Sequence, residues 1–462
     1  MPQSPLLKPA PLRRSALLFT ALVLLAPLIL TRHVTYSKLR AATMCAAALG
    51  FLATAAATDF SPKHFLRSLF RLPTFPAIAF LLWAIARFFQ STPPPGPPRN
   101  MALAELLRLS CGILVFLGAS RITSTSSQIR GIFLTILTFA FLDSIAGILT
   151  VNPALHQAAS AGYFNKQLLA AFLVGLIPFS FVALFAGPAA IIRRTALPTF
   201  ILLISAMLLT GNRTSWIGAA VGLLVAAPFA FRHTSIPFKE NRLFIPLTLL
   251  AIFLAAVSIY GAQGLIRQRF DSDSYKTFTY RFPLWRAAVN MIRSNPALGI
   301  GIGQYPLHAS AADNFTHAIP DTKSVMQTGP TLWCIAHNEY LQTAAEIGLI
   351  GLGLYLAVLL SFFLLAIRSW LHMRPSPRRA LLAAATCAVI AQCIDALANP
   401  AWRFIDVNPI LWLMLALGVA AIPRRRLDTV KIEPTAPEDP TYRPADLQDS
   451  LLPAPTPDLY SM

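Results

Sequence analysis

Long apolar runs separated by short polar segments repeat along most of the chain. A helix that spans a bilayer needs about 20 predominantly apolar residues, and several runs approach or reach that length. They lack the alternating ten-residue pattern of an outer-membrane β-barrel strand. The pattern predicts about twelve membrane-spanning helices, at 15–30, 41–58, 75–89, 103–119, 131–150, 167–185, 198–210, 216–229, 244–260, 347–370, 380–396 and 405–422.

The basic residues of the connecting segments predict how these helices are oriented. Lys and Arg in short loops stay on the cytoplasmic side of the membrane. Every second connecting segment is rich in Lys and Arg, and these segments include Arg193 and Arg194. The remaining segments hold fewer basic residues, although segment 32–40 is an exception. If the basic segments face the cytoplasm, both termini lie there as well. The opposite face then carries segment 211–215 and the long segment 261–345.

Composition agrees with this interpretation. The chain is 55% hydrophobic and 12% charged, which is far from the balance of a soluble globular protein. Its net charge of +19 is spread over loops rather than gathered on one soluble domain, so we expect no nucleic-acid partner. The predicted fold class is an all-α polytopic membrane protein. Its parts are N-terminal helices at 1–160, a second transmembrane part at 161–422 that includes the loop 261–345, and a disordered, Pro-rich acidic tail at 423–462.

Segment 261–345 is long enough to be functional rather than connective. Its stretch 283–293 has a stripe of apolar residues at helical spacing, Leu284, Ala287, Ala288, Met291 and Ile292. This stripe predicts a short amphipathic helix on the membrane or on the bundle. Asn295 and Pro296 end that helix. Three glycines then predict a turn-rich connection: Gly299, Gly301 and Gly303.

Two residues near the ends of apolar runs are candidates for chemistry. His337 lies in CIAHNEYLQTAAEIG, directly before an apolar run, and an imidazole with its ordinary pKa of about 6.5 can accept a proton near neutral pH. A histidine that stabilises the start of the helix is the alternative. Arg213 lies between two apolar runs, where an ionised side chain is costly unless it has a function. Its alternative is an interfacial arginine whose head group reaches lipid phosphates.

The predicted amphipathic helix carries two more basic candidates. Arg281 and Arg286 stand on either side of Trp285 in YRFPLWRAAVNMIRS. Guanidinium groups bind phosphate through two parallel hydrogen bonds, and an aromatic ring stacks on a sugar or a lipid. The alternative is a helix with a solvated basic face, in which Trp285 anchors the membrane interface.

Acidic residues near or within the spans have both structural and functional interpretations. Glu346 would orient His337 or Arg213, or simply complement the dipole of its helix. Asp143 and Asp395 fall within spans, where they would translocate ions or make structural hydrogen bonds. Glu105 and Arg108 stand three residues apart and would neutralise each other.

Outward arginines with a histidine and no acidic metal cluster suit a substrate with a phosphate or pyrophosphate group. We therefore expect no metal ion and no cofactor. The long loop lacks the paired carboxylates of a hydrolytic glycosidase.

Four segments resemble the O-antigen ligase and polymerase superfamily in order and spacing. They are GYFNKQLLAAFLVGLIP from Gly162, LLTGNRTSWIGAAVGLL, YRFPLWRAAVNMIRSNPALGIGIGQY and AHNEYLQTAAEIGLIGLGLYL. The resemblance covers roughly the second half of the chain. It implies a metal-independent, inverting glycosyltransferase of the GT-C type in the bacterial inner membrane. Such an enzyme takes its glycan from an undecaprenyl-diphosphate-linked donor on the periplasmic side.

The resemblance also implies roles for individual residues. Arg213 and Arg281 would hold the donor diphosphate, and His337 would activate or position the acceptor hydroxyl. Further substrate contacts are expected from Trp285, Arg286, Asn338 and Glu346.

The acceptor divides the superfamily. An enzyme that uses lipid A-core as the acceptor is an O-antigen ligase, and the resemblance favours this class. One that uses a second lipid-linked glycan is a polymerase, and one that uses a protein hydroxyl is an O-oligosaccharyltransferase. The expected partners are thus the lipid-linked donor, a glycan, lipid or protein acceptor, and membrane lipids. A transporter that uses Asp143 and Asp395 is the alternative from another class.

Overall fold

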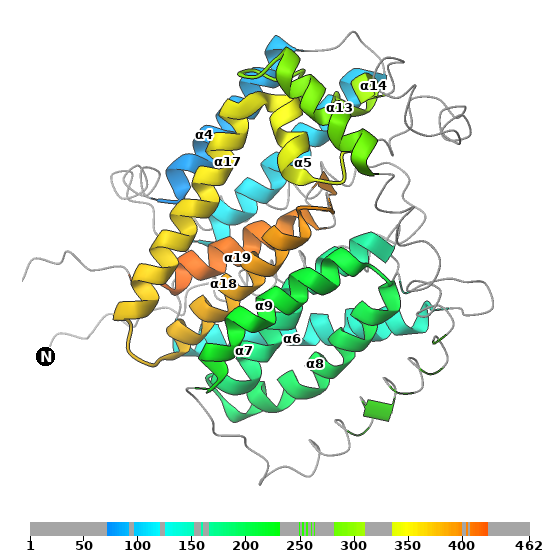
Figure 1. Cartoon of the computed structure of the whole chain (residues 1–462). Helices are drawn as coiled ribbons and strands as arrows, with labels where there is room; N and C mark the ends of the chain where they lie inside the picture. The colour runs from blue at the N-terminus through cyan, green and yellow to red at the C-terminus, as the bar shows by residue number, and fades with distance from the viewer. Residues whose placement is uncertain are drawn as a thin grey trace, which may run out of the picture. The chain divides into compact units, whose positions relative to one another are not determined.

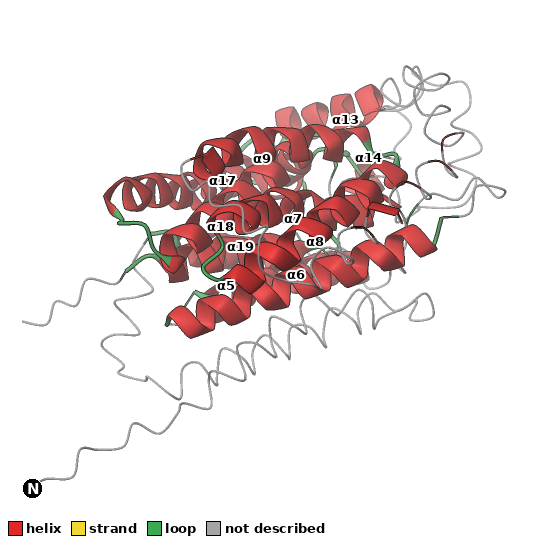
Figure 2. Cartoon of the chain, turned by 90° about the horizontal axis from the view of Figure 1, so that it is seen from below, coloured by secondary structure: helices red, strands yellow, loops and turns green. Residues whose placement is uncertain are grey.

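A computed structural model describes residues 72–91, 97–120, 125–151, 159, 166–231, 281–309, 335–399, 403–404 and 407–423, with single positions between 249 and 263. These residues form helices and loops and contain no strand (Figure 1, Figure 2). The all-helical prediction is confirmed for this part of the chain. The predicted spans at 15–30, 41–58 and 244–260 and the predicted tail lie outside the described residues.

The apolar helices match the remaining predicted spans in order. They are α4 (Thr74–Gln90), α5 (Pro97–Ala119), α6 (Ser126–Leu149), α7 (Lys166–Ala186), α8 (Ala190–Thr210), α9 (Arg213–Phe231), α17 (Glu339–His372), α18 (Pro377–Asp395) and α19 (Asn408–Ala421). In the described part, six are long and apolar enough to cross a membrane, and α4, α9 and α19 are shorter. A total of twelve spans stays a prediction.

Helix α18 joins two groups of helices. On one side it packs against α19, which in turn packs against α5, while α4 contacts both α5 and α17. On the other side it packs against α7 and α9, and α7 also contacts α8 (Figure 1). Most side chains of α7 and α18 are buried, as expected for helices with neighbours on several sides.

Helix α8 begins eight residues earlier than the predicted span at 198–210. It starts at Ala190 and continues through Pro198. Interior prolines are tolerated in membrane helices, because neighbouring helices and hydroxyl groups satisfy the freed backbone groups. Arg193 and Arg194, predicted in a loop, therefore lie within this helix, near its start.

Helix α17 is interrupted at Gly348, where the backbone leaves helical geometry with φ 76° and ψ 175°. A break leaves carbonyl groups without helical partners. Here three N–H groups from elsewhere satisfy them: Ile300 N–H donates to Ala345 O at 2.9 Å, Gly301 N–H to Glu346 O at 2.8 Å, and Trp83 Nε1 to Ile347 O at 2.9 Å.

The glycine-rich connection 295–303 is therefore packed against the break in α17. A Cβ atom on Gly348 would lie 2.0 Å from Ala297 O, and one on Gly299 would lie 2.5 Å from Glu346 O. On its other side, Arg87 of α4 donates to Leu298 O at 2.7 Å. The glycines are required for close backbone approach as well as for turning the chain.

The predicted amphipathic helix is present as α13 (Arg281–Ser294). It forms a small core with α14 (Tyr305–Ala309) and the start of α17. Tyr305 adds a hydrogen bond of 2.6 Å from its hydroxyl to Leu284 O. The buried face of α13 consists of Pro283, Leu284, Ala287, Ala288 and Met291, so the predicted stripe is confirmed except for the half-buried Ile292.

Candidate functional site

The first turn of α9 provides one side of the candidate site. Gly211 ends α8 with a φ of 64°, and this left-handed turn reverses the chain. Asn212 O then accepts the amide of Trp216 at 3.2 Å, so that α9 starts at Arg213. The unsatisfied N–H groups at a helix start favour bound anions. Arg213 thus lies where the helix itself attracts negative charge.

Arg281 is the first residue of α13 and reaches the first turn of α9. Its Nη1 lies 3.4 Å from Thr214 Oγ1, next to Arg213 in the sequence. Burial lowers the pKa of Arg281, and the charge of Asp395 opposes that change. Two arginines from segments 68 residues apart therefore belong to one region of the molecule.

Asp395, the last residue of α18, contacts the same region. Ser215 donates to one carboxylate oxygen at 2.7 Å, and Asn399 donates to the other at 3.2 Å. The carboxylate of Asp395 is buried, and its charge acts on Arg281. Buried acids of this kind are stable when hydrogen-bonded, and the structure thereby gives Asp395 partners in the candidate site.

His337 lies in the turn before α17, close to Arg281. Burial and the nearby charge of Arg281 lower the pKa of His337 to about 4. The imidazole is therefore neutral at pH 7 and able to accept a proton. Its Nδ1 is buried and has no hydrogen-bond partner within the described part of the chain. The backbone of His337 has a φ of 49°, a left-handed conformation that histidine adopts more readily than most residues.

Asn338 caps α17 directly after His337. Its side-chain oxygen accepts the amide of Leu341 at 2.9 Å, which satisfies one of the free donors of the helix start. In the described structure this side chain is engaged by its own helix. Its predicted contact with substrate stays a prediction.

Two predicted substrate contacts lie further along α13. Arg286 is exposed, and Trp285 is half-buried. The Trp285 ring packs edge-on against Phe282, with the two ring centroids 5.8 Å apart. Their contacts with substrate therefore stay predictions.

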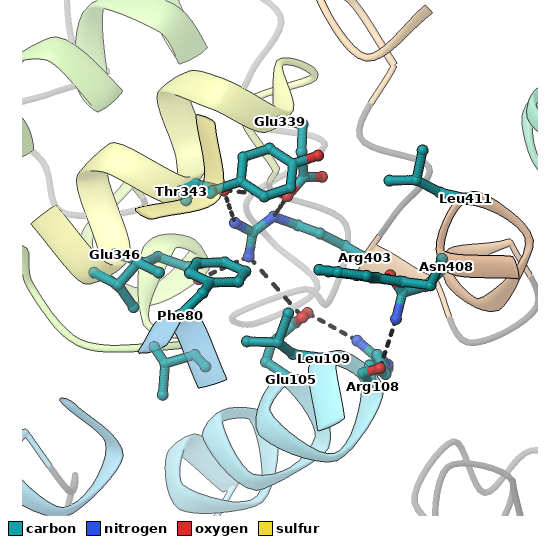
Figure 3. Close-up of a pocket in the computed structure, with 14 residues that line it drawn as sticks. Phe80, Glu105, Arg108, Leu109, Glu339, Thr343, Glu346, Arg403, Asn408 and Leu411 are labelled. Atoms are coloured by element: carbon teal, nitrogen blue, oxygen red, sulfur yellow. Dashed lines mark hydrogen bonds and ion pairs between the residues drawn. The ribbon is translucent and has the colours of Figure 1, made fainter. Parts of the chain in front are cut away.

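Glu346 lies in a buried cluster of charges around Arg403 (Figure 3). Arg403 Nη1 contacts Glu346 at 2.7 Å, and its Nε contacts Glu339 at 3.3 Å. Glu105 lies 3.9 Å from the same guanidinium, and its predicted pairing with Arg108 is confirmed at 2.8 Å. The cluster therefore connects α5, α17 and the segment before α19.

This cluster was not predicted from the sequence. Arg403 stands in a short segment between two apolar runs, and Glu105 and Glu339 are separated by about half of the chain. The sequence did contain one indication of the cluster. Acidic residues on apolar helices are rare and need a partner, so a basic residue near them could have been expected. A pocket of about 50 Å³ lies beside Arg403, with Phe80 and Tyr355 among its lining residues.

The arrangement brings three kinds of group together. Arg281 adds positive charge at the start of α9. The buried carboxylate of Asp395 binds the same turn, and the neutral imidazole of His337 lies within reach of the charge of Arg281. Such a group can bind a phosphate or diphosphate and accept a proton from a nearby hydroxyl. In the part of the chain that the structure describes, no three His, Cys, Asp or Glu residues are placed to hold a metal ion.

Residues 198–356 match the family model of O-antigen ligase. This match confirms the resemblance to the O-antigen ligase-related family. The matched region begins in α8, ends in α17 and contains Arg213, Arg281 and His337. Asp395 and Arg403 lie beyond it. No curated protein matches the chain.

The O-antigen ligase match and the apolar helices together indicate a multi-pass membrane protein with a function of the O-antigen ligase or polymerase type. They also indicate a glycosyltransferase-like activity and lipid-linked glycan substrates.

Proposed function

We propose that this protein transfers a glycan from an undecaprenyl-diphosphate-linked donor to an acceptor hydroxyl at the periplasmic face of the bacterial inner membrane. The proposed acceptor is lipid A-core, which would make the protein an O-antigen ligase. The observation that carries the proposal is the position of Arg281. It contacts the first turn of α9 beside Arg213 and acts electrostatically on His337.

The proposed reaction forms a bond between the acceptor oxygen and the anomeric carbon of the glycan. The bond from that carbon to the diphosphate oxygen breaks, and the lipid diphosphate leaves with the electron pair. Arg213, Arg281 and the start of α9 stabilise the negative charge that develops on the leaving group. His337 accepts the acceptor proton. Attack from the face opposite the leaving group inverts the anomeric carbon, and in this proposal no metal ion takes part.

The test is glycan transfer by purified protein in lipid nanodiscs, with single variants of the three residues. Arg213→Met and Arg281→Met are expected to reduce kcat/KM for the donor by about 100-fold or more, since each loses a charge-assisted contact of about 1.5–3 kcal/mol and the electrostatic effect on the transition state. His337→Gln is expected to reduce kcat by about 100-fold.

The same experiment separates the alternatives. The products formed with lipid A-core, with a second lipid-linked glycan and with a protein acceptor distinguish ligase, polymerase and O-oligosaccharyltransferase. The transporter alternative requires solute uptake that depends on Asp143 and Asp395. Full glycan transfer by all three variants, together with loss of uptake in Asp143→Asn, would exclude the proposed transferase.

A further inference from the structure

The backbone on both sides of His337 is held by buried side chains. The preceding residue, Ala336, donates its N–H to Oε1 of Gln342 at 3.0 Å. The following residue, Asn338, caps α17. His337 itself has a left-handed backbone, which persists only where the surroundings fix it. What fixes the turn on its N-terminal side is therefore the side-chain amide of Gln342.

Gln342 is itself held in one orientation. Its side chain is 2% exposed, and Nε2 donates to Glu346 Oε1 at 3.1 Å. An amide group accepts through its oxygen and donates through its nitrogen. The Glu346 carboxylate can only accept and the Ala336 N–H can only donate, so the Gln342 amide must direct its nitrogen to Glu346 and its oxygen to Ala336. The hydrogen bond to Ala336 thus depends on Glu346.

Glu346 is fixed in turn by Arg403 and by the glycine-rich connection. Its Oε2 accepts from Arg403 Nη1 at 2.7 Å and from the amide of Gly303 at 3.0 Å. Arg403 also contacts Glu339, whose backbone N–H donates to Ala396 O at 3.0 Å. The turn 336–339 is consequently anchored at both ends through the same guanidinium.

We propose that Gln342 is a positioning residue for His337, acting through Ala336 as the last member of a hydrogen-bonded series from Arg403 through Glu346. This inference rests on the proposed function, in which His337 receives the proton of the acceptor. The series holds the imidazole beside Arg281 and so sets the direction from which the acceptor hydroxyl approaches. A misplacement of about 1 Å in a catalytic group is enough to reduce the rate of chemistry about 100-fold.

Two variants distinguish positioning from general packing. Gln342→Leu keeps the approximate volume and removes both hydrogen bonds. The double variant Gln342→Glu with Glu346→Gln reverses the pair. The carboxylate introduced at position 342 accepts from Ala336 and from the side-chain nitrogen introduced at position 346, while the amide oxygen at position 346 faces Arg403. The long hydrogen bond of 3.4 Å from the Tyr305 amide to Oε1 of Glu346 is not reproduced. Because one carboxylate is lost and one is gained, the net charge of the cluster is unchanged.

A matched control is available on α18. Gln392 is 1% exposed, and neither its side-chain oxygen nor its side-chain nitrogen has a hydrogen-bond partner within the described residues. Gln392→Leu therefore makes the same chemical change at an equally buried position without breaking a series that leads to His337.

The experiment has two readouts in the full-length protein in nanodiscs. Hydrogen–deuterium exchange of the peptide that contains 336–341 reports whether the turn is held. Glycan-transfer kinetics report kcat and the donor KM. Gln342→Leu is expected to exchange at least about tenfold faster in this peptide and to lose about 10- to 100-fold in kcat, with the donor KM within about twofold. The reversed pair restores both values, and Gln392→Leu changes neither.

Two results would overturn the positioning role. One is an unchanged exchange rate in Gln342→Leu, and the other is a folded reversed pair that restores exchange without restoring kcat. If instead the wild-type protein transfers no glycan, the proposed function fails. The exchange data would still decide whether Gln342 holds the turn at His337.

Discussion

At the scale of single residues, the electrostatic setting of His337 decides what it can do. Burial and Arg281 keep its pKa at about 4 in the free protein, so it is a weak base before substrate binds. A donor diphosphate on Arg281 would offset the positive charge that lowers this pKa. Under the proposed function, donor binding would therefore raise the pKa of His337 and make it a better proton acceptor.

This setting predicts two different pH profiles for glycan transfer. The acid limb of kcat/KM for the donor reports the free protein and is expected near pH 4, where His337 becomes protonated. The acid limb of kcat reports the substrate complex and is expected at a higher pH, because the donor diphosphate offsets the charge of Arg281 while burial still holds the pKa of His337 below its ordinary value. Initial rates from about pH 3.5 to 8 test this, with recovery of activity at pH 7 as the control for acid damage. Coincident limbs at about pH 6.5 would contradict it.

At the scale of one element, α17 works as two helical pieces with a junction at Gly348. The first piece carries Glu339, Gln342 and Glu346 toward the buried cluster, while the second continues as an apolar span. At the junction, the connection 295–303 binds Ala345 O, Glu346 O and the amide of Leu349, while Trp83 of α4 binds Ile347 O. In a continuous helix, Ala345 O and Glu346 O would accept from their own helix, and the amides of Ile300 and Gly301 would lose these partners.

Gly348→Ala is expected to destabilise the protein strongly. A Cβ there would meet Ala297 O at 2.0 Å, and its φ of 76° is unfavourable for alanine. The cost is expected to be about 2–4 kcal/mol, from strain and lost backbone hydrogen bonds. Thermal unfolding in nanodiscs measures it.

The matched control for this change is Gly353→Ala on the same helix. Its Cβ would have no atom within 4 Å, and alanine favours a helix by about 1 kcal/mol over glycine. The control is expected to have an unchanged or slightly raised Tm. Equal Tm values for the two variants would argue against the junction.

At the scale of the whole molecule, Arg403 connects helices that are far apart in the sequence. Its partners are on α5 and α17, and it precedes α19. Buried carboxylates are costly without a cation, whereas a complete network is tolerated. The relative position of these helices is therefore coupled to the candidate site, because the same guanidinium anchors the turn at His337.

Arg403→Met is expected to lower the stability of the protein by about 3–5 kcal/mol, as for removal of one member of a buried ion pair. Arg403→Lys retains the charge but loses the forked geometry, so its Tm is expected between those of Arg403→Met and the wild type. Arg368→Met on the exposed face of α17 is the control and should change stability by about 0.5 kcal/mol or less. A wild-type Tm in Arg403→Met would contradict a structural role for the cluster.

The sequence alone determined the features that depend on neighbours within a few turns. Apolar runs predicted the described spans, the spacing of Leu284, Ala287 and Ala288 predicted α13, and the three-residue separation predicted the Glu105–Arg108 pair. These are local properties: a helix has a period of about 3.6 residues, and a membrane requires a continuous apolar length.

Only the tertiary structure decided which distant groups meet. The contacts of Arg281 with Thr214, of Ser215 with Asp395 and of Arg403 with three glutamates join segments separated by 57 to 298 residues. Such contacts leave no periodic signal in the chain, since they depend on how whole helices pack. For the same reason the sequence indicated His337 as a candidate but not the series through Gln342 that holds it.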